Sequence, residues 1–447
     1  MTTSVERSLW SRTAALGSRW RSLPFWRSDS AQGLLSLVDQ GIVSGANFLT
    51  AVIIARCGTS QTLGAYFLAW NVFTIVQAVQ GDLVLSPYIV LGRNRSGRDA
   101  VRYTGSSFAH HLILVGTSCL LMVLALNLLG RNAGQDLQGL QEASLAFLAA
   151  MPFLLTRQFI RNLGIARLRL GAMTVVDGGI AAFQVVALLI LGVCGTLTVS
   201  KAYIVLGLAC GLPSLVWLCS RAEPMRFAPG LIRTHWLENW SFGRWALASQ
   251  LAGRATGYLL PWTLALVHGE ATTGLLAACV TLVNMGGTFI TGVSNFLTPR
   301  ATAAYVEGGI EELLRVLRTV AAIYLGVVGV FVVVLLLFGG HISWIVYGPH
   351  YAGNENVIRW LALALLLSSL TITVGNGLWA MRRPEANFSA DFCGMLAGLL
   401  VLATTVQAWG ATGAALALCV GNFVGLAVRW TKFRAYIAEL RVEGTGS

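Results

Sequence analysis

About twelve apolar segments, each of about 20 residues, run through the sequence and constrain its fold more than any other feature. A helix of that length crosses the hydrocarbon core of a bilayer. The sequence therefore predicts an all-α polytopic membrane protein. The segments before the middle of the chain are 33–55, 64–91, 107–129, 143–163, 172–191 and 202–218, and those after it are 245–267, 274–297, 319–338, 357–380, 387–406 and 411–428.

The composition agrees with a membrane location and argues against a nucleic-acid partner. Only 11% of the 447 residues are charged, 55% are hydrophobic, and the mean hydropathy is +0.69. Soluble domains carry about 25% charged residues. The net charge of +12 would suit nucleic acid. However, the arginines stand at the ends of the apolar segments, where positive charge fixes topology, and form no single stripe.

The basic residues also predict how the chain is threaded through the membrane. Most of the 31 arginines and lysines fall in stretches that share a side with the N-terminus, including 1–32, 93–102, 157–169 and 221–244. The loops on the other side, such as 130–142 and 339–356, are short and carry few basic residues. By the positive-inside rule, both termini lie in the cytoplasm. No outer loop is long enough to hold a domain.

The longest polar break, 221–239, lies near the middle of the chain with six apolar segments on each side. Several residues recur about 211 positions further along, in the same order: Gly58 and Gly269, Gly64 and Gly274, Pro87 and Pro299, Asp177 and Asp391. Each half has an even number of helices, so the repeat is parallel. We predict two six-helix lobes around a central seam. The parts are a basic cytoplasmic arm (1–32), the N-terminal lobe (33–219), a cytoplasmic linker (220–241), the C-terminal lobe (242–430) and a cytoplasmic tail (431–447).

Polar side chains recur at helical spacing in three of the segments and mark a candidate cavity wall. The candidates are Asp39, Gln40, Ser44, Asn47, Gln250, Arg254, Tyr258, Thr281, Asn284, Thr288, Thr291 and Asn295. A charge at membrane depth is costly and usually faces a cavity or a partner. For Arg254 two interpretations stay open, contact with an anionic substrate or a static pair with Asp39 or another buried acid. For the neutral residues the alternative is hydrogen bonding between helices.

Two further groups of charges stand near the predicted inner ends of helices. Arg157 and Arg161, spaced at i and i+4, are either a topology signal or a cytoplasmic gate that contacts phosphate. Asp177 and Asp391 lie in the first turns of their segments, where we expect helix capping or pairing with Arg169 and Arg383.

No arrangement of residues predicts catalysis, a cofactor or a metal site. The sequence has no Gly-rich phosphate loop, no HExxH and no GxSxG motif. The histidines lack partners at metal-ligand spacing. The eight cysteines form no CxxC pair, and we expect them to be small buried hydrophobic residues.

Four motifs resemble a known family. The helix Asp39–Phe48, the segment Arg157-Gln158-Phe159-Ile160-Arg161, the loop Tyr347–Tyr351 and the segment Trp409–Ala415 resemble those of bacterial polysaccharide-lipid flippases. These flippases belong to the multidrug/oligosaccharidyl-lipid/polysaccharide exporter superfamily. Gln158 stands where that family usually has Glu. The resemblance implies a V-shaped pair of six-helix lobes, a central cavity and alternating access.

The resemblance also implies a function and a location. It implies a flippase for a polyprenyl-diphosphate-linked oligosaccharide in the bacterial cytoplasmic (inner) membrane, serving O-antigen or exopolysaccharide biosynthesis beside polymerases and glycosyltransferases. One alternative is a multidrug or small-cation antiporter of the same fold, which would need a cavity rich in acids and aromatic rings. A second is a membrane glycosyltransferase, polymerase or ligase, which would need catalytic acids in large outer loops. The short outer loops disfavour an enzyme, and Arg254 with neutral Thr and Asn side chains favours a diphosphate-linked glycan.

Overall fold

The structure, a computed structural model, describes residues 29–93, 95–132, 138–167, 169–220 and 224–445. Most of the expected basic arm lies outside these residues, as does the side chain of Asn295. Every regular element in the described ranges is helical, as the sequence predicts. The helices are α2 (Asp29–Cys57), α3 (Ser60–Gln80), the π-helix η2 (Gly81–Leu85), α4 (Ser86–Gly92), α5 (Gly97–Asn132), α6 (Gln138–Ala166), α7 (Leu170–Val193), α8 (Val199–Ser220), α9 (Pro229–Tyr347), the 3-10 turn η4 (Pro349–Tyr351), α10 (Glu355–Ala380) and α11 (Pro384–Thr445).

Three glycines divide the two longest helices into antiparallel rods. Gly269 and Gly309 interrupt α9 with φ values of 80° and 64°, and Gly410 interrupts α11 with a φ of 48°. Glycine adopts a positive φ without steric cost, so the chain reverses at each point without a loop. Nine helical stretches of the described chain are long and apolar enough to span a membrane. Divided at these glycines, they give about twelve rods, in agreement with the sequence.

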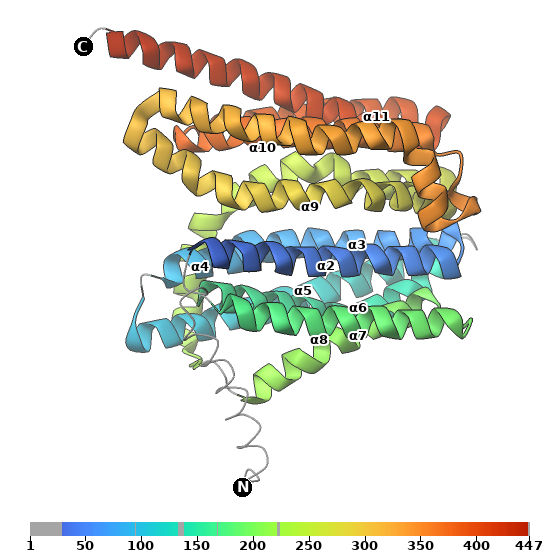
Figure 1. Cartoon of the computed structure of the whole chain (residues 1–447). Helices are drawn as coiled ribbons and strands as arrows, with labels where there is room; N and C mark the ends of the chain where they lie inside the picture. The colour runs from blue at the N-terminus through green and yellow to red at the C-terminus, as the bar shows by residue number, and fades with distance from the viewer. Residues whose placement is uncertain (1–28, 94, 133–137, 168, 221–223, 446–447) are drawn as a thin grey trace.

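The rods lie side by side in two groups (Figure 1). On one side α10, α11 and the last part of α9 pack on one another, and on the other side α6 packs on α8 and α5. Between these groups lie α2, packed on α7, and α3, which makes extensive contact with α9. The linker predicted at 220–241 is partly helical, because α9 begins at Pro229. Its helix also contacts α5.

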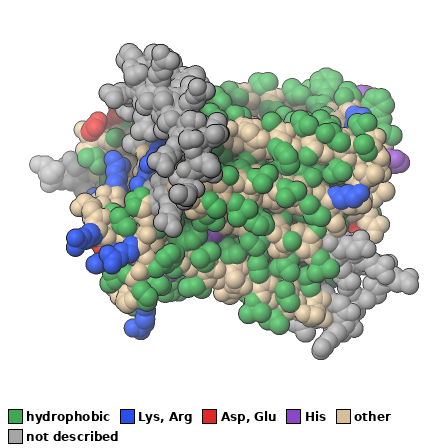
Figure 2. All heavy atoms as spheres, turned by 90° about the horizontal axis from the view of Figure 1, so that it is seen from below, with side chains coloured by type: hydrophobic (Ala, Val, Ile, Leu, Met, Phe, Trp, Pro, Cys, Tyr) green, Lys and Arg blue, Asp and Glu red, His purple; other side chains and the backbone are tan. Residues whose placement is uncertain are grey.

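The outer surface is apolar over most of the length of the bundle. Figure 2 shows hydrophobic side chains across the middle of one face and basic side chains gathered mainly at one end. Val193, Leu266 and Leu337 are 88%, 78% and 68% exposed. Such side chains are unfavourable in water but match lipid tails. The protein is therefore a multi-pass membrane protein.

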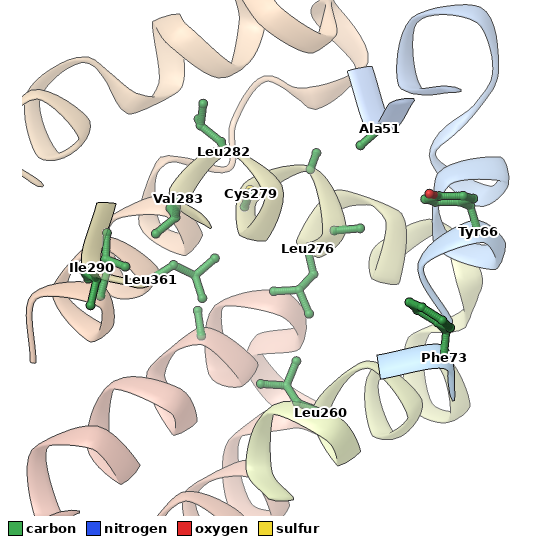
Figure 3. Close-up of a cluster of buried hydrophobic side chains, with 14 of the residues drawn as sticks. Ala51, Tyr66, Phe73, Leu260, Leu276, Cys279, Leu282, Val283, Ile290 and Leu361 are labelled. Atoms are coloured by element: carbon green, nitrogen blue, oxygen red, sulfur yellow. The ribbon is translucent and has the colours of Figure 1, made fainter. Parts of the chain in front are cut away.

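The buried core joins the two groups of helices. In Figure 3 the second rod of α9 places Leu276, Cys279 and Val283 among apolar side chains from neighbouring helices, including Tyr66 and Leu361. The expectation that the cysteines are buried is only partly correct. Three are buried, two are intermediate, and three are exposed, namely Cys57, Cys194 and Cys219. The exposed thiols stand at or next to the ends of apolar helices, where a small side chain is tolerated on either surface.

At one end of the bundle, α3 and the second rod of α9 cross at backbone contact. A Cβ atom on Gly64 would lie 1.9 Å from the carbonyl oxygen of Glu270, and one on Gly274 would lie 1.8 Å from that of Ser60. Gly64 and Gly274 are partners in the predicted repeat, and so are Ser60 and Glu270 at the same spacing. We call these four residues the glycine crossing. Any side chain at either glycine would push the two helices apart.

Candidate functional site: a central polar cavity

A cavity of about 1110 Å³ lies between the two groups of helices. Its wall comes from α2, α3, η2, the first two rods of α9, α10 and α11, so both halves of the chain contribute. The wall carries aromatic, hydroxyl and amide side chains. The charged residues that line it are Asp82, Arg254, Asp391 and Arg429.

Eight of the twelve candidate cavity residues line this cavity. They are Ser44, Asn47, Gln250, Arg254, Tyr258, Thr281, Asn284 and Thr288. The Ser44 and Thr288 hydroxyls are 2.5 Å apart and link α2 to α9 across the seam. Gln40 and Thr291 lie outside the lining. Asn295 falls among the side chains that the structure does not describe.

Asp39 is not in the lining and pairs with Arg161, which corrects the expected pair of Asp39 with Arg254. Its side chain is buried and forms an ion pair with Arg161. The same Arg161 donates through Nε to Asp177 at 2.9 Å, and Arg157 donates to the other Asp177 oxygen at 2.7 Å. Arg161 carries several donors in a planar fork, so it can bind two carboxylates at once.

This set of four, Asp39, Arg157, Arg161 and Asp177, is called the N-terminal charge cluster below. It explains why Asp177 does not pair with Arg169 as expected. Two arginines one helical turn apart on α6 approach the carboxylate from a single helix face, so each of its oxygens already accepts a hydrogen bond from a cation. One donor of Arg157 and two donors of Arg161, which were candidates for phosphate contact, thus bind carboxylates, whereas Nε of Arg157 is buried without a partner among the described residues. Arg157 also borders a separate small cavity of about 100 Å³.

The C-terminal half has a comparable cluster that borders the central cavity. Arg429 donates to Asp391 at 2.5 Å and, through Nε, to the Asn387 side-chain oxygen at 3.0 Å. Ser249 donates to the other Asp391 oxygen at 3.2 Å. Asp391 was expected to pair with Arg383, which instead lies over the Tyr436 ring. We call Ser249, Asn387, Asp391 and Arg429 the C-terminal charge cluster.

Arg254 is the cation of the cavity wall that lacks an ion pair. It is exposed to the cavity and has no carboxylate within 4 Å among the described residues, whereas Arg429 is buried and paired. Tyr258, one helical turn further along α9, lines the cavity beside it. The Arg254 guanidinium therefore offers its donors to the cavity.

Asp82 also lines the cavity, and the sequence analysis did not predict it. It belongs to the π-helix η2, and one of its carboxylate oxygens is buried without a hydrogen-bond partner. Arg254 and Asp82 are close enough to attract each other. The backbone of η2 meets α9, because a Cβ on Gly243 would lie 2.1 Å from the Asp82 carbonyl oxygen. The one signal in the sequence was an acid within the apolar segment 64–91.

Aromatic rings form the part of the wall between α2 and α3. Trp70 stacks on Tyr66 with ring centroids 6.1 Å apart, and both line the cavity. Close by, the Trp262 indole donates to Asn71 at 3.1 Å, which is a second polar link between the halves. The wall therefore offers flat apolar surface as well as hydroxyl and amide groups.

Comparison with known proteins gives the fold. No protein family matches the sequence, and no curated protein matches it significantly. An inward-facing MATE-family multidrug resistance transporter of the MOP superfamily matches with a TM-score of 0.71 at 18% identity, over 94% of this chain and 98% of that one. The lipid II flippase MurJ in an inward closed conformation matches at 0.70 and 15%, over 90% and 87%. A MOP superfamily transporter from Pyrococcus furiosus matches at 0.65 and 17%, over 92% and 95%.

This chain has their fold. These neighbours are transporters and a flippase rather than enzymes, in line with the absence of catalytic motifs in the sequence. At such low identities the likeness concerns the fold and assigns no substrate.

Proposed function

We propose that the protein flips a polyprenyl-diphosphate-linked oligosaccharide across the bacterial cytoplasmic membrane by alternating access, for the synthesis of a surface polysaccharide such as O-antigen or exopolysaccharide. Arg254 carries the proposal, because it is a cation in the central cavity with no ion pair among the described residues. A diphosphate brings about two negative charges into a route of low dielectric, where it needs such a partner. Arginine can hold phosphate oxygens with two parallel donors.

The neutral wall suits the glycan part of the cargo. Asn47, Gln250, Asn284 and Thr288 present amide and hydroxyl groups that can exchange hydrogen bonds with sugar hydroxyls. Trp70 supplies an aromatic face for the apolar side of a sugar ring. The MurJ neighbour, described as a lipid II flippase, supports a lipid-linked cargo for this fold.

In this proposal Asp82 helps the empty protein to return after the cargo is released. In the empty cavity its carboxylate attracts Arg254. A diphosphate carries more charge than one carboxylate and displaces it. After release, Asp82 attracts Arg254 again, which neutralises the wall and favours the return of the empty protein.

The proposal places both termini and the 221–239 stretch in the cytoplasm, with glycosyltransferases supplying the cargo and a polymerase consuming it. Its topology can be checked in sealed cells with single cysteines in a cysteine-free variant. An impermeant reagent should label sites in 130–142 and 339–356 and should leave a site in 221–239 unlabelled. Labelling of 221–239 from outside would contradict the topology.

The direct test of function is transport of a fluorescent polyprenyl-diphosphate disaccharide in proteoliposomes. Arg254→Ala should lose nearly all transport and Arg254→Lys most of it, because Lys lacks the paired donors. The matched control is Arg244→Ala on the same helix, which removes an exposed arginine outside the cavity lining. Thr288→Trp should also block transport by filling the cavity. Full transport by Arg254→Ala at normal abundance would overturn the proposal.

A second function, export of cationic drugs by an antiporter, is supported by the unpartnered carboxylate oxygen of Asp82 and by the multidrug-transporter neighbours. The two functions make opposite predictions. A cation exporter should lose ethidium efflux in Asp82→Asn and keep it in Arg254→Ala. A diphosphate flippase should have no ethidium efflux and should lose glycolipid transport in Arg254→Ala.

A further inference from the structure

A second large hollow, of about 950 Å³, lies in the C-terminal half and is separate from the central cavity. Its walls come from the rod of α9 after Gly309, from α10 and from the rod of α11 after Gly410. Most of the lining is apolar, with Leu317, Val374 and Leu426 on the three walls. Arg318 and Arg434 are the basic residues of the lining. We call this hollow the outer groove.

The outer groove and the central cavity lie on opposite faces of the same two helices. On α10, Thr371 and Ile372 line the cavity, while Thr373 and Val374 line the groove. On the last rod, Asn422 lines the cavity and its neighbour Phe423 lines the groove. Phe423 is 59% exposed. The groove therefore opens toward the lipid that surrounds the bundle and not toward the seam.

The two arginines of the groove have no partner among the described residues. Both are exposed, and neither forms an ion pair or a hydrogen bond with a residue that the structure describes. Other basic residues at this end do have partners: Arg315 pairs with Glu312 at 2.6 Å, and Lys432 donates to Ser389 at 2.5 Å. Arg318 comes from the α9 wall and Arg434 from the α11 wall, so two walls of the groove each carry a guanidinium.

The dimensions of the groove match one leaflet. Phe423 precedes Arg434 by three helical turns, about 16 Å along the helix. That is close to half of the hydrocarbon thickness of a bilayer, about 30 Å. The apolar part of the groove thus runs from the arginine-rich end of the bundle to about the middle of the membrane. This is the span of one acyl chain below its phosphate.

We infer that the outer groove is a binding site for an anionic phospholipid of the arginine-side leaflet, whose phosphate lies between Arg318 and Arg434 and whose acyl chain fills the apolar groove. The charge of the two free arginines selects an anionic headgroup. The enclosure by three helices distinguishes the groove from the rest of the apolar surface. The lipid is a resident of the C-terminal half and is distinct from any cargo in the central cavity.

Native mass spectrometry of the detergent-purified protein, titrated with phosphatidylglycerol or phosphatidylcholine, tests the inference. The wild type should bind one phosphatidylglycerol more tightly than any phosphatidylcholine. Arg318→Gln with Arg434→Gln should weaken that first phosphatidylglycerol about 30-fold, because each basic side chain contributes about a factor of five toward an anionic lipid. Arg318→Lys with Arg434→Lys should lose less, since the charge remains.

The matched control removes two arginines from the same end of the bundle, Arg315→Gln with Arg383→Gln, and should leave the affinity unchanged. A second variant, Ala427→Trp, fills the groove and should weaken both lipids while the arginines stay in place. Equal binding of the two lipids by the wild type would overturn the inference. So would an equal loss in the control pair and the groove pair.

Discussion

The N-terminal and C-terminal charge clusters both neutralise an aspartate inside the membrane, but with arginines from different helices. Asp177 and Asp391 occupy the same position in the repeat, and each needs a cation inside the membrane. In the N-terminal half that cation comes from α6, whereas in the C-terminal half it comes from the last rod of α11. The need for neutralisation is shared by the two halves, but the helix that supplies it is not.

The repeat indicates why the cation for Asp391 comes from α11 and not from the helix that corresponds to α6. The position in the C-terminal half that corresponds to Arg161 is Gly375. A Cβ on Gly375 would lie 3.6 Å from Nε of Arg429, so the missing side chain leaves space that Arg429 occupies. The N-terminal cluster lies outside the central cavity, whereas Asp391 and Arg429 border it. We conclude that the N-terminal cluster is chiefly structural, and that the C-terminal cluster is placed where cargo can reach it.

The largest expected effect is on stability in the N-terminal cluster. Arg161→Ala leaves two buried carboxylates, Asp39 and Asp177, short of a cation and should cost about 3–5 kcal/mol. Thermal unfolding followed by tryptophan fluorescence, with urea titration in detergent, would measure it. Adding Asp39→Asn to Arg161→Ala should recover part of the loss. A variant as stable as the wild type would show that the cluster is not structural.

Arg429→Ala should cost less stability, about 1–3 kcal/mol, because Asp391 borders a cavity that water can enter. Its effect on transport should exceed what the loss of stability explains. Arg429→Gln with Asp391→Asn keeps the site neutral and should restore stability. If Arg429→Ala destabilises as much as Arg161→Ala, the contrast between the clusters fails.

At the glycine crossing, unlike at the two charge clusters, we expect equivalent substitutions in the two halves to have the same effect on stability. Gly64→Ala and Gly274→Ala should each cost a similar amount, about 1–3 kcal/mol, because each Cβ meets the carbonyl of the other half. Both should also increase the labelling of a cysteine placed at Asn47 by a small thiol reagent added from the outer side. Gly326→Ala is the control, since nothing lies within 4 Å of its Cβ. Unequal effects at the two glycines would argue against a symmetrical crossing.

The smallest effect concerns the Ser44–Thr288 link across the seam. A double-mutant cycle of Ser44→Ala and Thr288→Ala should give a coupling energy of about 0.6 kcal/mol, the average for such hydrogen bonds in membranes. The unfolding free energies of the two single variants and of the double variant give the value. Zero coupling would mean that the two hydroxyls act independently.

Sequence patterns predicted the helical architecture well because it depends on local properties. Segment length, apolar content and basic ends need no knowledge of neighbours in space, and helical spacing placed Ser44, Asn284 and Thr288 on faces that line the cavity. The ion-pair partners could not be predicted in this way. Arg161 reaches Asp39 across the fold, 122 positions away in the sequence, and nothing local indicates that Asp39 pairs with Arg161 rather than with Arg254.

Asp82 was missed for a different reason. Among the residues three and four positions away only Ser86 is polar, so no polar stripe pointed to Asp82, and a π-helix has no clear sequence signature. Arg429 directly follows the last apolar segment, 411–428, a place where an arginine indicates topology and not a binding site. Gly375, which makes room for it, was an unremarked glycine in an apolar segment until its spatial neighbour was known.

The π-helix at Asp82 changes which faces of the same transmembrane helix point toward a given neighbour before and after it. The corresponding position in the second half is Ser294, where α9 remains a regular α-helix. One residue more or less turns the following part of a helix by about 100°. Deleting one residue from Gly81–Leu85 would therefore rotate α3 and α4 relative to each other without changing their composition. Asp82 could then not keep its place in the cavity wall while α3 and α4 both keep their present packing contacts.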